Sequence, residues 1–308
     1  MDKQYTAHLL MVRPACFQFN TETALSNAFQ KNISELDVAQ IKEKAIAEFD
    51  NYVNTLRSHG INVTVIQDTT TPAKPDAIFP NNWISMDKDG TVFLFPMLTP
   101  NRRLEVRSEI IDILKQKYFI NEIKDFTFYV NENKFLEGTG SMIFDHINKI
   151  VYACLSPRTN KNLLVEYCML ISYKPIYFTA SDEQQHLVYH TNVMLTIGDK
   201  FAVICLDSII DKSERNTVVR QLENDGHEII NISFAQMGFF AGNMLQVQSE
   251  DGKTFLVMSQ TAFDSLTSTQ IAQIKKYTSI LSVQIPTIET IGGGSARCML
   301  AEIFLPEK

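Results

Sequence analysis

The sequence predicts an α/β fold in which five similar units close into a ring, as in a propeller with mixed blades. Two observations support this prediction: a short motif recurs five times, and amphipathic helical stretches separate its copies. In each copy a small or polar residue precedes Met or Trp, and an apolar strand follows. The copies lie about 50 to 60 residues apart, and they begin at Asn82, Ser141, Val193, Asn243 and Cys298.

Polar turns follow the first four copies of the motif. They lie at 87–90, 146–149, 198–200 and 250–253. Two of them contain Asp-Gly, which between apolar runs is a strong hairpin signal. The fifth copy ends with the chain, so its partner is expected to be the apolar run 9–12 near the N-terminus. That pairing would close the ring.

Helical stretches are expected between the hairpins, because apolar residues recur there near a 3.6-residue period. The stretches are 34–59, 103–117, 160–172, 208–225 and 264–279. A unit of three strands and one helix is too small to bury its own apolar face, so the units should pack together. We therefore expect one domain over residues 1–308. The alternative is a two-domain α/β protein in which the repeats are coincidental.

Composition excludes several classes of function. The formal net charge is −7 and no Lys/Arg block occurs, which disfavours nucleic-acid binding. No apolar run approaches the ~18 residues of a membrane span. The five Cys form no Cys-x-x-Cys pair, which disfavours a zinc site or a disulfide framework. Reduced thiols favour a cytoplasmic protein.

A ring would bring the residues before each repeated strand to one pocket near the axis. Three of these, Cys298, His190 and Glu137, supply a nucleophile, a base and a carboxylate. Three glycines at 292–294 precede Cys298 and permit close backbone approach to a ligand, and Arg297 could favour the thiolate. Each residue alone has a structural explanation. Their convergence on one repeat position favours a catalytic site.

The glycine-rich segments do not form phosphate loops. No Lys-Ser/Thr pair follows 292–294, and no third glycine completes a dinucleotide fingerprint after 138–140. We therefore expect no nucleotide cofactor.

The motifs Glu137-Gly138, His190-Thr191-Asn192 and Gly292 to Cys298 together resemble the guanidino-group modifying enzymes of the pentein superfamily. These include arginine deiminases, dimethylarginine hydrolases and amidinotransferases. The segments 11–14, 76–83 and 240–245 are similar to one branch, the citrulline-utilisation hydrolases. The resemblance covers nearly the whole chain. It implies a five-bladed, pseudo-five-fold α/β propeller (the pentein fold), a Cys-His-Glu site and no cofactor or metal.

Two positions depart from the arginine deiminase pattern. Those enzymes carry Asp where this chain has Asn82, three residues after Phe79, and Asn192, two residues after His190. At ~4 Å and an effective dielectric constant of ~20, each lost charge pair is worth about 4 kcal/mol before desolvation. A neutral ureido group suits the amides better than a guanidinium does. The substrate is therefore expected to be the amino acid citrulline.

The expected mechanism is covalent. The Cys298 thiolate attacks the ureido carbon of citrulline, Asn82 and Asn192 orient the group, and Glu137 accepts from its N–H groups. His190 protonates the departing ornithine amine and then activates water against the S-carbamoyl enzyme. Asp76 is a further candidate in the substrate site, or as the acid that pairs with His190.

The substrate carboxylate needs a cationic clamp, and two arginines are candidates. Arg103 and Arg158 lie near the positions that arginine deiminases use, with Arg102 an open alternative to Arg103.

Three other functions stay open: an arginine or methylarginine deiminase, an amidinotransferase, and a non-catalytic binding protein such as the ribosomal anti-association factor of this fold. Assembly into a homo-oligomer is also open.

Overall fold

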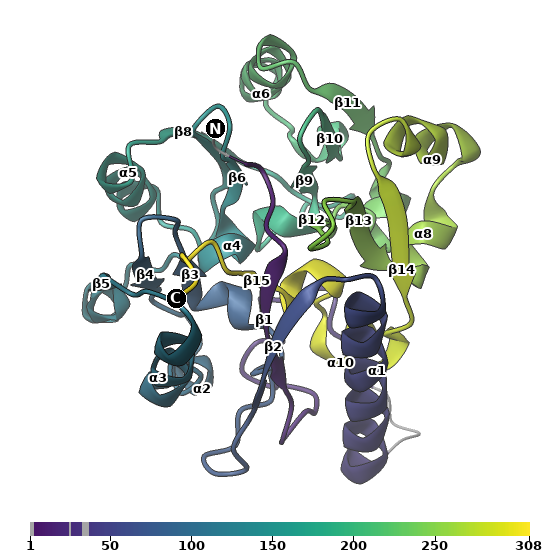
Figure 1. Cartoon of the computed structure of the whole chain (residues 1–308). Coiled ribbons are helices and arrows are strands. Elements are labelled where there is room, and N and C mark those ends of the chain that lie inside the picture. The colour runs from purple at the N-terminus through teal and green to yellow at the C-terminus, as the bar shows by residue number, and fades with distance from the viewer. Residues whose placement is uncertain (1–2, 25, 33–36) are drawn as a thin grey trace.

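The computed structural model describes residues 3–24, 26–32 and 37–308. Five sheets of three strands each surround a central axis, as Figure 1 shows. The architecture is the five-bladed, pseudo-five-fold α/β propeller, or pentein fold, and the prediction from the repeats is confirmed. In the described residues no helix is both long enough and apolar enough to cross a membrane.

The strands, in chain order, are β1 His8–Arg13, β2 Asn62–Gln67, β3 Ile84–Met86, β4 Thr91–Leu94, β5 Glu122–Asp125, β6 Ile143–Asp145, β7 Ile150–Cys154, β8 Lys174–Phe178, β9 Leu195–Ile197, β10 Phe201–Ile204, β11 Glu228–Asn231, β12 Leu245–Gln248, β13 Thr254–Ser259, β14 Ser279–Val283 and β15 Ala301–Glu302.

The α-helices are α1 Val38–Ser58, α2 Pro100–Arg103, α3 Ser108–Lys117, α4 Gly138–Ser141, α5 Lys161–Leu170, α6 Lys212–Asn224, α7 Phe234–Gly238, α8 Gln260–Ser265, α9 Ser268–Lys275 and α10 Pro286–Gly292. Short 3₁₀ turns are η1 Pro80–Asn82, η2 Thr127–Glu132, η3 Thr191–Val193, η4 Leu206–Ser208 and η5 Ala296–Met299.

Each blade repeats one topology. The inner strand pairs antiparallel with the middle strand, as Ile84 does with Leu94, and a hairpin turn joins the two in the four blades that do not contain the chain ends. The middle strand pairs parallel with the outer strand, as Thr91 does with Glu122. A parallel pair needs a crossover connection, and a helix supplies it in every blade. This is the strand, strand, helix, strand unit that the sequence indicated.

The fifth blade joins the two ends of the chain. Strand β1 pairs antiparallel with β15, with Leu10 opposite Ala301, and parallel with β2. The expected partner of the last repeat is therefore confirmed.

Two predicted helices are divided in the structure. The stretch 103–117 breaks between α2 and α3, because Glu105 turns inward to meet buried Arg102. The stretch 264–279 contains the end of α8 and all of α9, because Thr267 caps a new helix with a capping box to Gln270. The predicted start of the first helix, at residue 34, lies outside the described residues; α1 follows an Asp37 cap.

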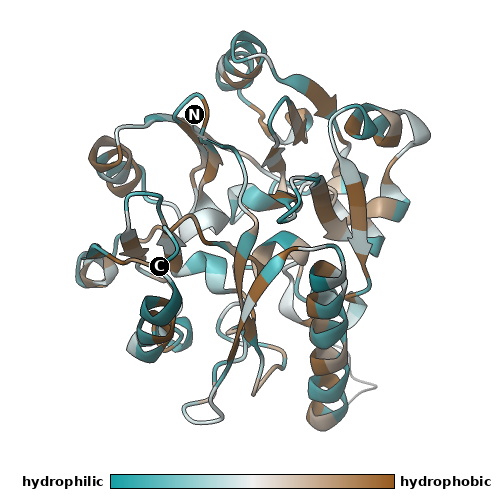
Figure 2. Ribbon diagram, viewed as in Figure 1, coloured by the Kyte–Doolittle hydropathy of each residue, from teal (hydrophilic) through white to brown (hydrophobic). Residues whose placement is uncertain are grey.

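The core lies between the sheets and the inner faces of the crossover helices. The middle strands β4, β7 and β10 are buried along their whole length, so they read as continuous apolar runs. Figure 2 shows the apolar residues on the strands and on one side of helices such as α1.

One end of the axis collects the turns that precede the inner strands. These are η1, α4, η3 and η5, which lead into β3, β6, β9 and β15. Contacts between α4 and η1, between α4 and η3, and between η1 and η5 hold them together. The candidate catalytic residues lie on or next to these turns.

Candidate active site

The structure brings the candidate catalytic residues together. His190 and Glu137 share a hydrogen bond of 2.8 Å between Nε2 and Oε2. The amide nitrogen of Asn192 lies 3.4 Å from the Cys298 sulfur. Cys298, His190, Asn82, Asp76 and Arg158 line one cavity, whose volume is about 20 Å³, and all of them are buried.

Glu137 is the acid that pairs with His190, and Asp76 is not. Burial would raise the pKa of the Glu137 carboxyl, but Arg158 and His190 outweigh it and lower the pKa to about 2. Burial lowers the pKa of His190 to about 4, against the opposing effect of Glu137. The imidazole is therefore neutral near pH 7. Its Nε2–H donates to the carboxylate, and Nδ1 is left as the basic nitrogen.

Glu137 occupies a different position from the one expected for a substrate ligand. Its Oε1 accepts from the Leu98 backbone N–H at 2.9 Å, and its Oε2 accepts from His190 and, at 3.4 Å, from Arg158. It is not among the residues that line the cavity. The geometry therefore suits Glu137 to orient His190 rather than to accept from a ureido N–H.

Two carboxamides face the Cys298 sulfur. Asn192 Nδ2 lies at 3.4 Å and Asn243 Nδ2 at 3.2 Å. Burial nevertheless raises the pKa of the Cys298 thiol, and it outweighs the opposing effects of the Ser295 backbone contact, Asn243 and Arg297. The charge of Arg297 lowers the pKa of Cys298, which is the direction expected, but burial outweighs it. The Arg297 guanidinium donates to the Leu300 carbonyl and to Glu302.

Asn243 precedes one of the repeated strands, so the ring predicts that it faces the pocket, but the sequence argument gave it no role. Its Oδ1 accepts from the backbone N–H of Arg297 at 3.0 Å, so it also holds the turn that carries Cys298. Its position in the sequence indicates such a role, because Asn243 begins the fourth copy of the motif.

Arg103 does not lie in the substrate site, contrary to the expectation from the sequence. Its guanidinium donates to the backbone carbonyls of Met97 and Leu98, away from the cavity. Arg102 lines the cavity instead, and donates to Asn82 Oδ1 at 2.7 Å and to Glu105 at 2.9 Å. The two residues are neighbours on α2, where each step turns the side chain by about 100°. One residue therefore separates a buried position from a position at the surface.

Arg158 lies where it was expected, beside the cavity. One of its Nη atoms donates to Ser26 Oγ at 2.7 Å, and the other contacts Glu137. Its buried Nε has no hydrogen-bond partner in the part of the chain that the structure describes.

Asp76 also lines the cavity. Its Oδ2 accepts from Asn20 at 2.7 Å and from Thr23 at 3.2 Å, while Oδ1 has no hydrogen bond among the described residues. Burial raises its pKa, although Arg102 opposes this effect.

A loop near the N-terminus covers the cavity, which no local sequence pattern indicated. Asn20 and Thr23 bond to Asp76, and Asn27 donates to the carbonyls of Gly292 and Gly293. The backbone N–H of Lys31 donates to the Thr290 carbonyl at 2.7 Å. The loop thus bridges the two sides of the site.

Two glycines are required by the packing around the site. A Cβ on Gly140 would lie 2.4 Å from Asn82 Nδ2 and 2.8 Å from His190 Nδ1. Gly293 has a φ of 62° and a Cβ there would meet Asn27 at 2.7 Å. Close packing at Gly140, and close packing with a positive φ at Gly293, therefore explain why glycine occupies both positions.

No cluster of three or more His, Cys, Asp or Glu residues that could hold a metal ion occurs in the regions described. The donors in the cavity are amides, guanidinium groups and a backbone turn, a set suited to a polar organic ligand.

Comparisons with known proteins give a matching family model. The family model described as "N,N dimethylarginine dimethylhydrolase, eukaryotic" matches residues 13–305. No curated protein matches the chain in sequence.

Solved structures show the same fold. The N-terminal domain of ArgZ, an arginine dihydrolase from the ornithine-ammonia cycle in cyanobacteria, superposes with a TM-score of 0.74 at 14% identity, over 97% of this chain and 98% of that domain. The chain spans only 41% of full-length ArgZ. A dimethylarginine hydrolase (DDAH) from Pseudomonas aeruginosa, solved with citrulline, gives a TM-score of 0.65 at 14% identity, over 98% of this chain and all of that one.

The family model spans nearly the whole chain, and the fold agrees with it. The protein therefore belongs to the eukaryotic-type N,N-dimethylarginine dimethylhydrolase family, within the pentein superfamily of guanidino-modifying enzymes.

Proposed function

We propose that this protein hydrolyses the ureido group of citrulline to ornithine, ammonia and carbon dioxide, through an S-carbamoyl intermediate on Cys298. The main observation is the orientation of Asn82. Arg102 donates to Asn82 Oδ1 at 2.7 Å, and a guanidinium can only donate. The amide NH₂ of Asn82 is therefore turned the other way, beside Gly140 and His190, where one N–H donates to Asn81 Oδ1 at 3.1 Å and the second N–H is left for a ligand.

This orientation distinguishes a ureido group from a guanidinium. A ureido group has a carbonyl oxygen, which needs a donor, whereas a guanidinium offers only N–H donors. Asn82 Nδ2 is placed to donate to a ureido oxygen. Asn192 does not line the cavity, but its Nδ2 lies 3.4 Å from the Cys298 sulfur and its Oδ1 is buried without a hydrogen bond among the described residues. A ureido group bound at the sulfur can therefore donate an N–H to Asn192 Oδ1. The pair matches one donor and one acceptor on a neutral group.

In the first step the Cys298 sulfur forms a bond to the ureido carbon. The thiol proton moves to Nδ1 of the neutral His190, and the resulting imidazolium is stabilised by Glu137. The two amides of Asn192 and Asn243 donate to the sulfur as it becomes anionic. The C–N bond to the ornithine side chain then breaks, and His190 returns the proton to the departing amine.

In the second step water replaces ornithine. Neutral His190 takes a proton from the water, which attacks the carbonyl carbon of the thiocarbamate and breaks the C–S bond. Carbamate leaves and decomposes to ammonia and carbon dioxide, and Cys298 regains its proton. Neither step requires an oxidant, a reductant or a cofactor.

The amino-acid end of citrulline is assigned to the arginines. Arg158 has an unpartnered buried Nε beside the cavity, and Arg102 lines the same wall. The cavity of about 20 Å³ holds roughly one water molecule. Substrate therefore enters only when the loop over Asp76 and Gly293 releases its hydrogen bonds.

A second candidate is a cationic substrate, arginine or a methylarginine. The buried Asp76 carboxyl, which has an oxygen without a hydrogen bond in the described chain, favours it. The family description and the ArgZ neighbour both concern guanidino substrates. Arg102 lies 3.9 Å from Asp76, however, and already offsets part of its charge.

The covalent intermediate provides the test. Protein is mixed with citrulline that carries an isotopic label at the ureido carbon, quenched in acid, and digested for mass spectrometry. We expect a labelled carbamoyl group on the peptide that contains Cys298, and no label in Cys298→Ser. Consumption of citrulline with no label on this peptide at any quench time would contradict the proposal. An amidino adduct from labelled arginine, without a carbamoyl adduct from citrulline, would establish the second candidate.

A further inference from the structure

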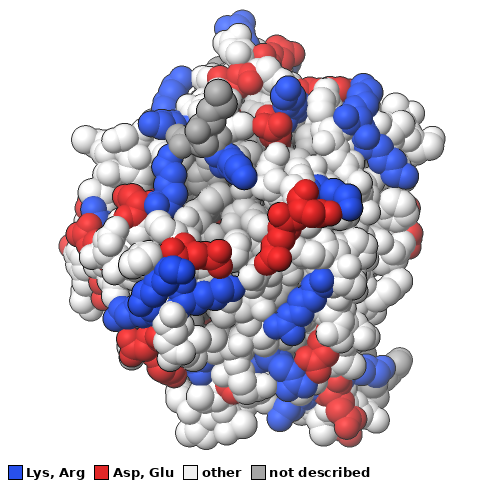
Figure 3. Space-filling model, in the orientation of Figure 1, with Lys and Arg blue, Asp and Glu red and all other residues white. Residues whose placement is uncertain are grey.

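A larger cavity lies at the opposite end of the axis from the candidate active site. Its volume is about 680 Å³, within the range of small-molecule sites. The residues that line it follow the inner strands, whereas the candidate catalytic residues precede them. Asp87 follows β3, His146 follows β6 and Ile303 follows β15. Figure 3 shows charged side chains of both signs around the hollow in the middle of this face.

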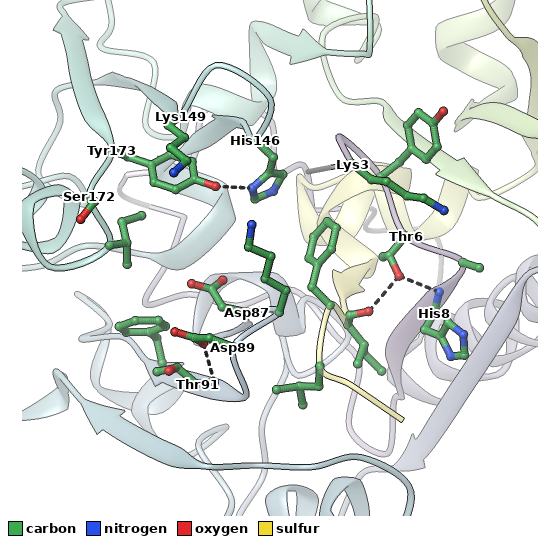
Figure 4. A pocket seen from close by; sticks show the side chains of 18 of the residues that line it. Lys3, Thr6, His8, Asp87, Asp89, Thr91, His146, Lys149, Ser172 and Tyr173 are labelled. Carbon is green, nitrogen blue, oxygen red and sulfur yellow. Dashed lines mark hydrogen bonds between the residues drawn. The ribbon is translucent and has the colours of Figure 1, made fainter. Parts of the chain in front are cut away.

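One wall of this cavity is cationic. Lys149 lies in the turn between β6 and β7, with a φ of 56°, and its side chain lies beside Tyr173 and His146 in Figure 4. The Tyr173 hydroxyl and His146 Nδ1 are 3.0 Å apart. In the described regions the Lys149 ammonium makes no ion pair. It is a cation without an anionic partner at the edge of a cavity.

The neighbouring wall carries two carboxylates. Asp87 and Asp89 lie on the turn between β3 and β4, and both line the cavity (Figure 4). Burial and the charge of Asp89 raise the pKa of Asp87 to about 7, although Lys88 opposes this effect. A further positive charge here would relieve the repulsion between the two acids.

The remaining walls are either apolar or already paired. Leu170, Ile171 and Phe304 supply apolar surface. On the far side His8 lies 3.5 Å from Glu307, and Lys3 donates to Gln248 at 3.3 Å. Lys88, which lies between Asp87 and Asp89 in the chain, also lines the cavity, and its charge lowers the pKa of Asp87. Lys149 and Asp89 are exposed, and together with Asp87 they are the charges of opposite sign that a ligand can join.

We propose that this cavity binds a free α-amino acid with an apolar side chain, at a site separate from the active site. The ligand carboxylate pairs with Lys149, its ammonium with Asp87 and Asp89, and its side chain packs on Leu170, Ile171 and Phe304. A zwitterion brings both charges in one molecule, whereas a simple anion or cation would leave one wall unpaired. The inference stands apart from citrulline hydrolysis, since none of these residues lines the catalytic cavity.

Calorimetric titration of the full chain in the Cys298→Ser background tests the site without turnover. The probes are L-leucine, L-methionine and L-phenylalanine, with isopentylamine and 4-methylpentanoate as analogues of leucine that lack one charge. We expect at least one of the three amino acids to bind at one site per chain. The two single-charge analogues should bind at least about tenfold more weakly, which is the loss of about 1.4 kcal/mol.

Variants locate the binding. Lys149→Met and Asp89→Asn should each weaken it at least about tenfold, whereas Lys275→Met, at an exposed lysine on α9, and Arg158→Ala, at the catalytic cavity, should leave it unchanged. The proposal is overturned if none of the three amino acids binds, if Lys149→Met and Asp89→Asn bind normally, or if Arg158→Ala abolishes binding. None of these outcomes depends on whether citrulline is a substrate.

Discussion

At the scale of single residues, we propose that Asn82 selects the substrate. Arg102 occupies its oxygen and Asn81 accepts from one of its N–H groups, so the second N–H can face the cavity. The sequence predicted an amide at this position and the neutral pocket that follows from it. It did not show which end of the amide would face the substrate, because that depends on a side chain twenty residues away.

Asn82→Asp tests this role. The new carboxylate would pair with Arg102 and remove the donor for a ureido oxygen. We expect kcat/KM for citrulline to fall at least about tenfold, and the ratio of arginine to citrulline turnover to rise. Steady-state assays with both substrates measure this, with Asn224→Asp on the exposed end of α6 as the matched control. An unchanged ratio of arginine to citrulline turnover would mean that Asn82 does not discriminate between a charged and a neutral substrate.

We propose that Asn243, whose Nδ2 lies 3.2 Å from the Cys298 sulfur, stabilises the sulfur as it becomes anionic. Hydrogen bonds to charged groups contribute about 1.5–3 kcal/mol, so Asn243→Ala should lower kcat by about tenfold or more. The same variant should move the pH at which iodoacetamide alkylates Cys298 to a higher value, which a loss of folding alone would not do. If kcat falls while the pH dependence of Cys298 alkylation is unchanged, Asn243 holds the turn that carries Cys298 and does not stabilise the thiolate.

The pH profile follows from His190 and Cys298. The competent resting pair is a neutral imidazole and a thiol. His190 becomes protonated only near its lowered pKa of about 4, so kcat/KM for citrulline should be lost only near that pH on the acid side. Burial raises the thiol pKa, so the basic limb should lie above the ordinary thiol range. An acid limb close to pH 6.5, the usual value for His, would show that the imidazole is not desolvated.

The same groups link stability to pH. The folded-state pKa of His190 is depressed, so between about pH 6.5 and pH 4 the unfolded chain binds a proton that the folded chain does not. The free energy of unfolding therefore falls as pH falls through this window. Glu137, depressed to about 2, adds a further loss between its ordinary pKa and about pH 2.

Which single residues could be predicted depended on the repeat. Cys298, His190, Glu137 and both Asn residues begin or flank copies of the motif, so their convergence followed from the ring. Arg102 and Arg103 carry no such information. They are adjacent and chemically identical, and only the rotation of the short helix α2 distinguishes them.

At the scale of elements, the short turns before the inner strands position the site, and the described loop segments 20–24 and 26–31 cover it. Hairpins and amphipathic helices were predictable, since their signals are local. The breaks at Glu105 and Thr267 were not, because buried pairing and a cap override the helical period. The covering loop was missed for a similar reason: its bonds reach Asp76 and Gly293, far away in the sequence.

Hydrogen exchange tests the loop. The described amides of this segment, such as that of Lys31, should exchange more slowly in Cys298→Ser with citrulline than without it, because closure over the substrate adds contacts to those in place. The amides of α6, remote from the site, serve as the internal control. Equal protection with and without citrulline would show that substrate enters by another route.

At the scale of the whole molecule, the ring explains why the cavities at the two ends of its axis differ in chemistry. Five short inner strands join the catalytic turns at one end to the large cavity at the other. The fifth sheet uses both ends of the chain, so we propose that residues 1–308 form a single catalytic domain. Repeat spacing and the expected pairing of the first and last strands were sufficient to predict this architecture from the sequence.

The most direct measurement is product formation from citrulline and from arginine, assayed side by side without an added cofactor. We expect ornithine and ammonia from citrulline, little product from arginine, and neither from Cys298→Ser. Ammonia from arginine, with citrulline left unconsumed, would contradict the central claim, because it would show that Asn82 and Asn192 do not set the charge of the substrate.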